Sequence, residues 1–304
     1  MDDTWALDLA TLSWDFLAEE AISPIAPVLY SSVMIVDDAG QNLYLATGQG
    51  PNGTTNEVWK LDLATQVWAN ITASAGQPPE ARYGTGGGKI NNNLVVTHGF
   101  GAARYDNTWR FNTASMQWEN ITPGGPLPLG RCLVASTPIA NGLVMHGGCS
   151  TPVGPCYQDD TWILDSTANV WREVLSDLRP EGRQHHTLAA TEANGVILFG
   201  GQDANQAARN DLWLLNLETG GWQAVEAANG PAPRYNHTAA WIPGRGMLIF
   251  GGRDGSTAFN DLWLLTVSVP APETAAPAAE PTEAPAEAAP PTPTPELVSE
   301  HDGG

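Results

Sequence analysis

Short runs of alternating apolar and polar residues recur along this chain at intervals of about fifty residues. Two clear examples are Trp59–Leu63 (WKLDL) and Trp213–Leu217 (WLLNL). Alternation with a period of two is typical of a β-strand and not of a helix. A turn such as Glu218–Gly221 follows, and a second apolar run begins with another tryptophan. The pattern therefore predicts pairs of short antiparallel strands.

The tryptophans show the repeat most clearly, because eleven of the twelve fall into two series. The first series contains Trp5, Trp59, Trp109, Trp162, Trp213 and Trp263. The second contains Trp14, Trp68, Trp118, Trp171 and Trp222, each nine residues after a member of the first. Trp241 belongs to neither. We expect first-series side chains such as Trp162 and Trp213 to fill space between repeated units.

Three further motifs recur in each period. An Asx or acidic pair precedes the first tryptophan, as in Asp159-Asp160 and Asn210-Asp211, where short side chains are expected to bond backbone donors. An apolar run ending in glycine lies upstream, as in Val196–Gly201. A Pro-x-x-Arg sequence lies further upstream, as in Pro180–Arg183. Each period thus holds about four strands and no helical pattern, which favours radial packing into a propeller.

These motifs together resemble the kelch repeat over residues 1–269. The resemblance, which includes the central domain of galactose oxidase, implies an all-β propeller of five to six blades with four antiparallel strands each. It departs at Pro27, which occupies the arginine position, at Thr47-Gly48, and at His98-Gly99, where a glycine pair is expected. We expect these first two full repeats to be less regular.

The repeat leaves an uneven strand count. Naming the strands of a blade a to d from the axis outward, the sequence predicts five a, five b, six c and five d strands. A six-bladed ring would lack two inner strands, so we expect a propeller that is incomplete at its N-terminus. A five-bladed ring could instead close by using residues 12–17 as strand d of the last blade.

Residues 270–304 have a different composition, rich in Pro, Ala, Glu and Thr, and we expect a disordered tail there. Thirteen basic and 33 acidic residues give the whole chain a net charge of −20, which argues against nucleic acid as a partner. No apolar stretch is long enough for a transmembrane helix.

The three cysteines bear on the cellular compartment. Cys149 and Cys156 flank a short loop, where a disulfide and two separate thiols are both open. Cys132 is expected to be a small buried apolar residue. A disulfide, the scarcity of lysine and the Pro-rich tail all favour a secreted or cell-surface protein.

The sequence gives little evidence for catalytic residues. His186 and His237 occupy equivalent repeat positions, which indicates a structural role, while the orientation of His98 and His146 stays open. We expect no metal site and no cofactor, because no local cluster of three ligands occurs. An enzyme is disfavoured, with a secreted carbohydrate-active propeller, galactose-oxidase-like or sialic-acid-mutarotase-like, as the alternative.

The predicted function is binding of a protein or carbohydrate through one face of the propeller. In a kelch-like blade the b–c loops gather on the face where the chain enters strand a, and loops on a rigid scaffold often carry function. Arginine and aromatic side chains commonly anchor interfaces. The candidates in these loops are Arg104, Tyr105, Tyr157, Arg209, Arg253 and Phe259.

Overall fold

The computed structural model describes residues 4–18, 28–227 and 229–266, where the only helical segment is a single 3₁₀ turn, Thr72–Ser74. These residues belong to one compact unit, Met1–Val267. The tail predicted at 270–304 lies outside the described residues. All strand pairs described below are antiparallel.

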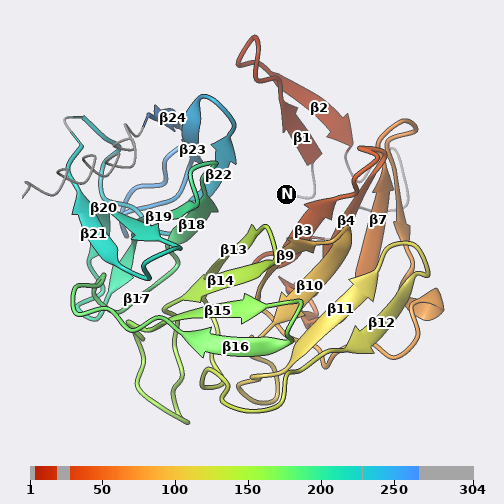
Figure 1. Ribbon diagram of the computed structural model, residues 1–304. Coiled ribbons are helices and arrows are strands. Elements are labelled where there is room, and N and C mark those ends of the chain that lie inside the picture. The colour runs from red at the N-terminus through yellow and green to blue at the C-terminus, as the bar shows by residue number, and fades with distance from the viewer. Residues whose placement is uncertain (1–3, 19–27, 228, 267–304) are drawn as a thin grey trace, which may run out of the picture. The chain divides into compact units, whose positions relative to one another are not determined.

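The strands form five blades around a common axis (Figure 1), which confirms the all-β kelch-type propeller. Blade 1 contains β3 (Val33–Val36), β4 (Asn42–Ala46), β7 (Val58–Asp62) and β8 (Val67–Asn70). Blade 2 contains β9 (Gly86–Ile90), β10 (Asn93–Thr97), β11 (Thr108–Asn112) and β12 (Gln117–Asn120). Blade 3 contains β13 (Ala135–Ile139), β14 (Gly142–His146), β15 (Thr161–Asp165) and β16 (Val170–Glu173).

Blades 4 and 5 continue the ring with small differences. Blade 4 contains β18 (Thr187–Ala190), β19 (Gly195–Asp203), β20 (Ala208–Asn216) and β21 (Trp222–Val225), and β17 (Arg183–Gln184) also pairs with β19. Within the described residues blade 5 has three strands, β22 (Thr238–Ile242), β23 (Gly246–Phe250) and β24 (Leu262–Leu265). A small ribbon, β5 (Gln49–Gly50) with β6 (Gly53–Thr54), extends blade 1. The innermost strands contact one another in the order β3, β9, β13, β18, β22.

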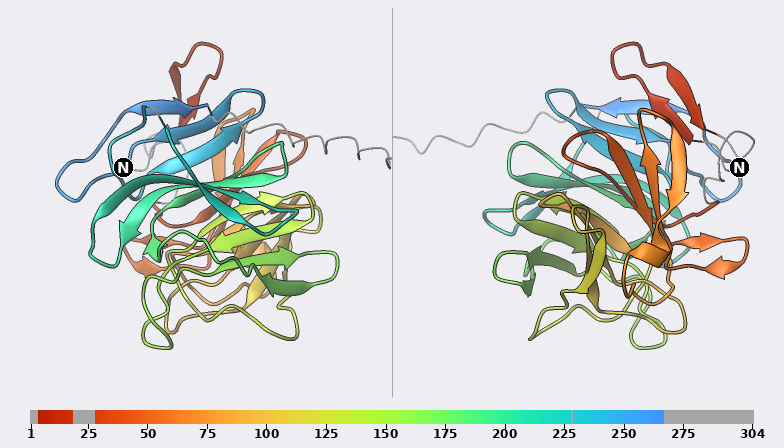
Figure 2. Two further views of the ribbon diagram at one scale, coloured as in Figure 1. Left: turned by 60° about the vertical axis from the view of Figure 1, so that its left-hand side comes forward. Right: turned by 90° about the vertical axis from the view of Figure 1, so that its right-hand side faces the viewer.

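The first strands of the chain form a separate hairpin, β1 (Thr4–Leu7) with β2 (Trp14–Ala18). It lies between blade 5 and blade 1 (Figures 1 and 2). Trp14 packs against Phe250 of blade 5, with ring centroids 4.9 Å apart, and the Trp68 indole of blade 1 donates to the Thr4 hydroxyl at 3.3 Å. The hairpin therefore connects the two ends of the ring.

This arrangement decides between the two ways of accounting for the extra strands. Among the described strands, β2 pairs with β1, and β24 pairs with β23 alone. Residues 12–17 therefore do not complete the last blade. The hairpin instead has the c and d positions of a repeat, with Trp5 and Trp14 at the positions that open those strands elsewhere.

Both tryptophan series pack against the cores between blades, as predicted for the first series, but the second series is buried more deeply. Trp118, Trp171 and Trp222 are each at most 8% exposed. Trp222 of blade 4 packs with Val144 of blade 3 and Leu188 of its own blade. First-series side chains such as Trp162 and Trp213 are only partly buried. The reason is that strand d of each blade lies against the preceding blade and places its tryptophan in the shared core.

The glycine-pair position has the same backbone conformation in all five blades. Its first residue is left-handed in each case, with φ between 59° and 69°, at Thr47, His98, Gly147, Gly200 and Gly251. A Cβ at Gly147 would meet the Arg183 carbonyl oxygen at 2.6 Å, so glycine is favoured there. Blades 1 and 2 differ in residue type at this position but keep the conformation.

Candidate ligand-binding face

A buried arginine organises one end of each of blades 2 to 5. These residues, Arg82, Arg131, Arg183 and Arg234, come from the Pro-x-x-Arg motif, and each is at most 1% exposed. In blade 4 the Arg183 Nε atom donates to the Glu181 carbonyl and Nη1 donates to the Gly200 carbonyl, at 3.0 and 2.9 Å. The side chain thus links the start of strand a to the end of strand b in its own blade.

The same guanidinium holds the start of strand c through the second residue of the acidic pair. Arg183 makes a bidentate contact with Asp211, at 2.6 and 2.8 Å, and the Trp213 indole donates to the same carboxylate at 2.8 Å. Burial acts to raise the pKa of Asp211, but the bonds and charge of Arg183 hold this pKa below its ordinary value. Arg131–Asp160 and Arg234–Asp261 repeat the arrangement. The acidic pair therefore serves this ion pair, beyond the turn role expected from the sequence.

Blade 2 departs from this scheme because Asn107 occupies the aspartate position. Its amide oxygen accepts from Arg82 at 2.6 Å, and the charge partner of Arg82 becomes Glu80. The buried Trp109 indole N–H has no hydrogen-bond partner among the described residues. One substitution in the repeat thus leaves one buried donor unsatisfied.

The backbone of the same arginine connects neighbouring blades. Its carbonyl accepts from the second glycine of the preceding blade, as in Gly148 N–H to Arg183 O at 2.8 Å. Its N–H donates back to that blade, as in Arg183 to Gln158 O at 3.2 Å. The arginine side chain bonds strands of its own blade, and the arginine backbone bonds the preceding blade. Together the four buried arginines and their partners form a rigid frame, which we call the arginine frame, beneath the loops at this end.

The frame surrounds an axial cavity of about 820 Å³. Its mouth is lined by the residues that lead into the inner strands, among them Tyr30, Tyr83, Leu133, His185 and Asn236. Each of the five inner strands starts two residues after a residue in the left-handed conformation, which is Ser31, Gly84, Leu133, His185 or Asn236. This conformation turns each preceding side chain toward the loop that follows strand b, as the Tyr83–Phe100 contact shows at 5.9 Å.

Aromatic and polar groups at this mouth are available to a ligand. Tyr30 is 56% exposed, and its ring lies 6.4 Å from that of Tyr83. His185 packs against Tyr235 with ring centroids 6.2 Å apart. Within the described residues, no hydrogen bond occupies the tyrosine hydroxyls at 30 and 83 or the Asn236 amide group. The mouth can therefore offer both stacking surfaces and hydrogen-bonding groups.

Four histidines lie beneath the face and are buried. Burial lowers the pKa of His98 and of His146 to about 3 and that of His237 to about 4, and it places the pKa of His186 well below 6.5. His146 accepts or donates at the Thr161 hydroxyl, 2.9 Å away, and His237 does so at Thr187, 2.8 Å away. These imidazoles are neutral at pH 7, and in the described residues no group of three metal-ligating side chains forms a site.

Three of the predicted site residues make supporting contacts. The guanidinium of Arg82 lies 4.1 Å from the ring centre of Tyr105, and Arg234 stacks in the same way on Phe259 at 4.3 Å. Arg209, at the equivalent position of blade 4, forms ion pairs with Glu181 at 2.9 Å and Asp203 at 3.4 Å. These contacts stabilise the loops, and a role in binding remains a prediction for all three.

The other predicted residues lie closer to the solvent or the cavity mouth. Arg253 is exposed and donates to the Gly255 carbonyl at 2.6 Å. Arg104 stacks on Phe100 at 4.3 Å and donates to the Thr151 carbonyl at 2.8 Å. Tyr157 is partly buried and left-handed, with φ 62°. Neither Arg104 nor Arg253 forms an ion pair with a carboxylate in the described part of the chain.

The sequence reasoning missed Tyr30, Tyr83 and His185 at the mouth, and Tyr235 beside His185. A signal for two of them was present, because a tyrosine directly follows the motif arginine at Arg82-Tyr83 and Arg234-Tyr235. The arginine is buried, and the next residue lies opposite the residue that follows the glycine pair of its own blade. Only the tertiary structure shows that Tyr83 reaches the cavity mouth.

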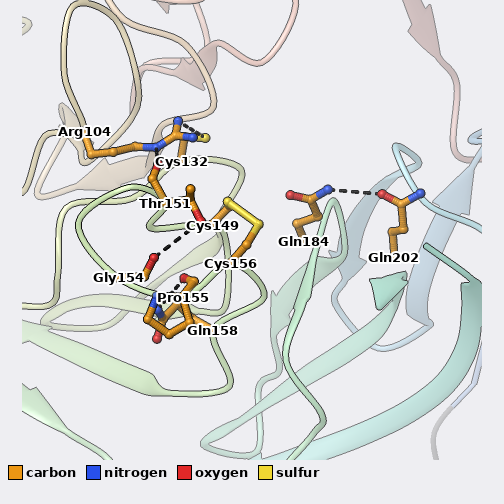
Figure 3. The surroundings of a disulfide bond; sticks show 10 residues. All are labelled: Arg104, Cys132, Cys149, Thr151, Gly154, Pro155, Cys156, Gln158, Gln184 and Gln202. Atoms are coloured by element: carbon orange, nitrogen blue, oxygen red, sulfur yellow. Dashed lines mark hydrogen bonds between the residues drawn. A yellow bond between two sulfur atoms is a disulfide. The ribbon is translucent and has the colours of Figure 1, made fainter. Parts of the chain in front are cut away.

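The loop between β14 and β15 contains a disulfide between Cys149 and Cys156, and Cys132 is a free, buried cysteine beside it (Figure 3). The described residues include no helix that is long and apolar enough to span a membrane.

The fold, the repeated arginine frame and the open axial mouth together define a repeat propeller built to present loops. Comparison with protein families agrees: the KLHDC2/KLHL20/DRC7 Kelch-repeats domain matches residues 1–148 and 133–289. The chain belongs to the kelch-repeat family, whose propellers are compatible with a protein-binding scaffold.

Individual relatives carry kelch repeats within much longer proteins. The chain is 24% identical over 269 residues to Adagio-like protein 1 of Oryza sativa subsp. japonica, covering 87% of this chain and 38% of that protein. It is 30% identical over 207 residues to acyl-CoA-binding domain-containing protein 5 of Arabidopsis thaliana, covering 63% of this chain and 31% of that protein. An F-box/kelch-repeat protein of Arabidopsis thaliana is 27% identical over 206 residues, 60% of this chain and 42% of that protein. The chain thus spans well under half the length of these relatives.

Proposed function

We propose that this propeller binds a protein ligand through the face around the axial cavity, using Tyr30, Tyr83 and Arg253 as anchors. The observation that carries the proposal is the cavity mouth, where the Tyr30 side chain is 56% exposed and lies beside the partly buried Tyr83. Tyrosine and arginine contribute strongly to protein interfaces because they combine large contact area with polar groups. The buried arginine frame holds them in place before a ligand arrives, which reduces the entropy cost of binding.

A carbohydrate is the second candidate ligand, since exposed aromatic rings beside unpaired hydroxyl and amide groups also suit a sugar. We further propose an oxidising compartment for the protein, in keeping with the Cys149–Cys156 disulfide. Catalysis stays outside this proposal, because the buried histidines are occupied with structural contacts or face the apolar interior.

Site-specific photo-crosslinking tests the protein ligand. A photoreactive phenylalanine analogue would replace Tyr30 in one variant and Leu175, which is 81% exposed after β16, in a matched control. We expect a crosslinked partner from position 30 only, and its yield should fall at least tenfold when Tyr83→Ala and Arg253→Ala are added. Equal crosslinking at both positions would contradict the proposal. Glycan-array binding that is lost in the same variants would favour the carbohydrate instead.

A further inference from the structure

The three cysteines of the chain lie side by side across three neighbouring backbone segments of blade 3. Cys132 and Cys149 exchange two backbone hydrogen bonds, at 3.0 and 2.9 Å, as a directly opposed antiparallel pair. Cys149 is in turn opposed to Cys156, with Cα atoms 4.1 Å apart, and these two carry the disulfide. Directly opposed residues point to the same side of a sheet. The free thiol and the disulfide therefore share one side.

Equivalent positions in other blades show that side chains meet at this pair. In blade 4 the corresponding residues are Gln184 and Gln202, whose amide groups form a hydrogen bond of 3.1 Å (Figure 3). In blade 2 they are Tyr83 and Phe100, whose rings are in contact. Hydrogen-bonded antiparallel pairs have Cα atoms about 5.5 Å apart, which is within the usual range for a disulfide. The backbone thus suits a Cys132–Cys149 bond as well as the one present.

The surroundings of Cys132 also differ from those of an inert buried thiol. The Nη1 atom of Arg104 donates to the Cys132 sulfur at 2.7 Å, while its Nε atom holds the Thr151 carbonyl inside the disulfide-closed loop (Figure 3). A guanidinium at this distance favours the thiolate, which is the nucleophile in disulfide exchange. Arg104 therefore connects the attacking sulfur to the loop that would be released.

We propose that blade 3 is a thiol–disulfide exchange site in which Cys132 attacks the Cys149–Cys156 disulfide. The Cys132 thiolate forms a bond to the Cys149 sulfur, the Cys149–Cys156 bond breaks, and Cys156 leaves with the electron pair as a thiolate. The proton lost by Cys132 passes to solvent and is regained by Cys156. One disulfide and one thiol are present before and after, so the step needs no external oxidant or reductant.

The exchange moves the reactive thiol from the core to the loop face. Cys132 is 1% exposed, whereas Cys156 is partly exposed in the b–c loop. A Cys132–Cys149 bond would close the start of strand a onto the end of strand b and free the loop at 150–155. Cys156 then becomes the group that a thiol reagent, or a partner's disulfide, can reach.

The rate should depend steeply on pH. Burial raises the pKa of Cys132 to about 11, although Arg104 acts to lower it, so only a small fraction is ionised at pH 7. At pH values below the pKa, the ionised fraction of Cys132 increases tenfold for each unit by which the pH rises. The exchange rate should therefore rise about tenfold per unit between pH 7 and 9.

Cleavage after Met145 provides a direct test, since it separates Cys132 from the other two cysteines. The folded full chain would be incubated with N-ethylmaleimide at pH 7, 8 and 9, quenched in acid, and cut with cyanogen bromide without reduction. We expect a growing fraction in which the two fragments stay linked until reduced and the label lies on Cys156. Fragments that always separate, with label on Cys132 alone or with Cys156 labelled but unlinked, would overturn the proposal.

Three variants keep the test decisive. Cys132→Ser should leave Cys149–Cys156 intact and Cys156 unlabelled. Arg104→Gln should slow linkage at pH 7 at least threefold while keeping its pH slope, and Arg104→Lys should restore part of the rate. An unchanged rate of linkage in Arg104→Gln would show that Arg104 is not a positioning residue. The exchange would then depend only on the arrangement of the three cysteines.

Discussion

The boundary between blades 3 and 4 and the seam at the β1–β2 hairpin use the same sequence pattern with different results. At the boundary, Trp222 is 4% exposed, and its indole donates to the Thr161 hydroxyl of blade 3 at 3.0 Å. At the seam, Trp14 has the equivalent place in its repeat and packs on Phe250, yet it is 42% exposed. The two tryptophans therefore differ in exposure because the strands around them differ, not because their positions in the repeat differ.

Among the described residues, inner strands bury the tryptophan at the boundary between blades 3 and 4, and the hairpin at the seam has no such strands. The blade 3–4 core includes residues from β13, β14, β18 and β19 around Trp222. The hairpin offers only c and d strands, and Met34 on the adjoining side of β3 is 60% exposed. A repeat motif thus specifies where a tryptophan points, while its burial depends on the strands beside it.

The largest expected difference in stability is between two single variants, each of which removes one of these tryptophans. Trp222→Ala should lower the free energy of unfolding by about 3–5 kcal/mol, because it leaves a cavity between two blades. Trp14→Ala should cost about 1 kcal/mol, since much of its ring is already in water. Urea unfolding followed by far-ultraviolet dichroism measures both. Equal losses would show that the seam is packed as tightly as the boundary.

Breaking the buried arginine contact tests the frame that supports the binding face. Arg183→Met should cost about 3 kcal/mol, because the Asp211 carboxylate and the Gly200 carbonyl lose their donor. Arg253→Met, on the exposed part of the same face, should change stability by less than about 0.5 kcal/mol. Thermal unfolding of the two variants provides the comparison, and a similar shift for both would argue against the frame.

Acid should weaken the blades through their buried histidines. Unfolded histidine has a pKa near 6.5, while burial lowers the folded pKa values of His146 and His237 to about 3 and about 4. Below pH 6.5 the unfolded chain binds protons that the folded chain does not. The resulting stability is therefore complete above about pH 6.5 and is lost as the pH falls toward 4.

Each such histidine contributes a slope of up to about 1.4 kcal/mol per pH unit. Urea midpoints at pH 7, 6 and 5 should fall in sequence, and His237→Gln should reduce the slope by about one proton. Trp14→Ala should leave the slope unchanged, because residues 4–18 contain no histidine. A midpoint that is constant from pH 7 to 5 would contradict the neutral buried state.

The smallest expected effect comes from restoring the regular contact in blade 2. Glu80→Gln with Asn107→Asp gives Arg82 the carboxylate found at Asp160 and gives the Trp109 indole an acceptor. We expect a gain of about 1 kcal/mol over Glu80→Gln alone, from one satisfied buried donor and a charged partner. Differential scanning calorimetry of the two variants resolves this difference. A lower stability of the double variant would show that Asn107 makes a contribution other than its bond to Arg82.

Several features could be predicted from the sequence alone. The tryptophan spacing and the alternating runs determined the strand number of each repeat, because local periodicity and turn residues act over a few residues. The predicted counts of five a, five b, six c and five d strands agree with the blade and hairpin strands of the described residues. The propeller fold followed from these short-range signals, and the resemblance of the repeated motifs to the kelch repeat implied the family.

Other features depend on tertiary structure, because both sides of a blade face another blade. Alternation shows that Trp213 and Trp222 lie on strands, but it does not say which of them is buried more deeply against the neighbouring blade. The positions of Tyr30, Tyr83 and His185 at one cavity, and of three cysteines in one row, arise from segments of different strands and blades. Only the closing of the sheets around the axis brings these side chains together, since no local pattern encodes contacts between residues so far apart in sequence.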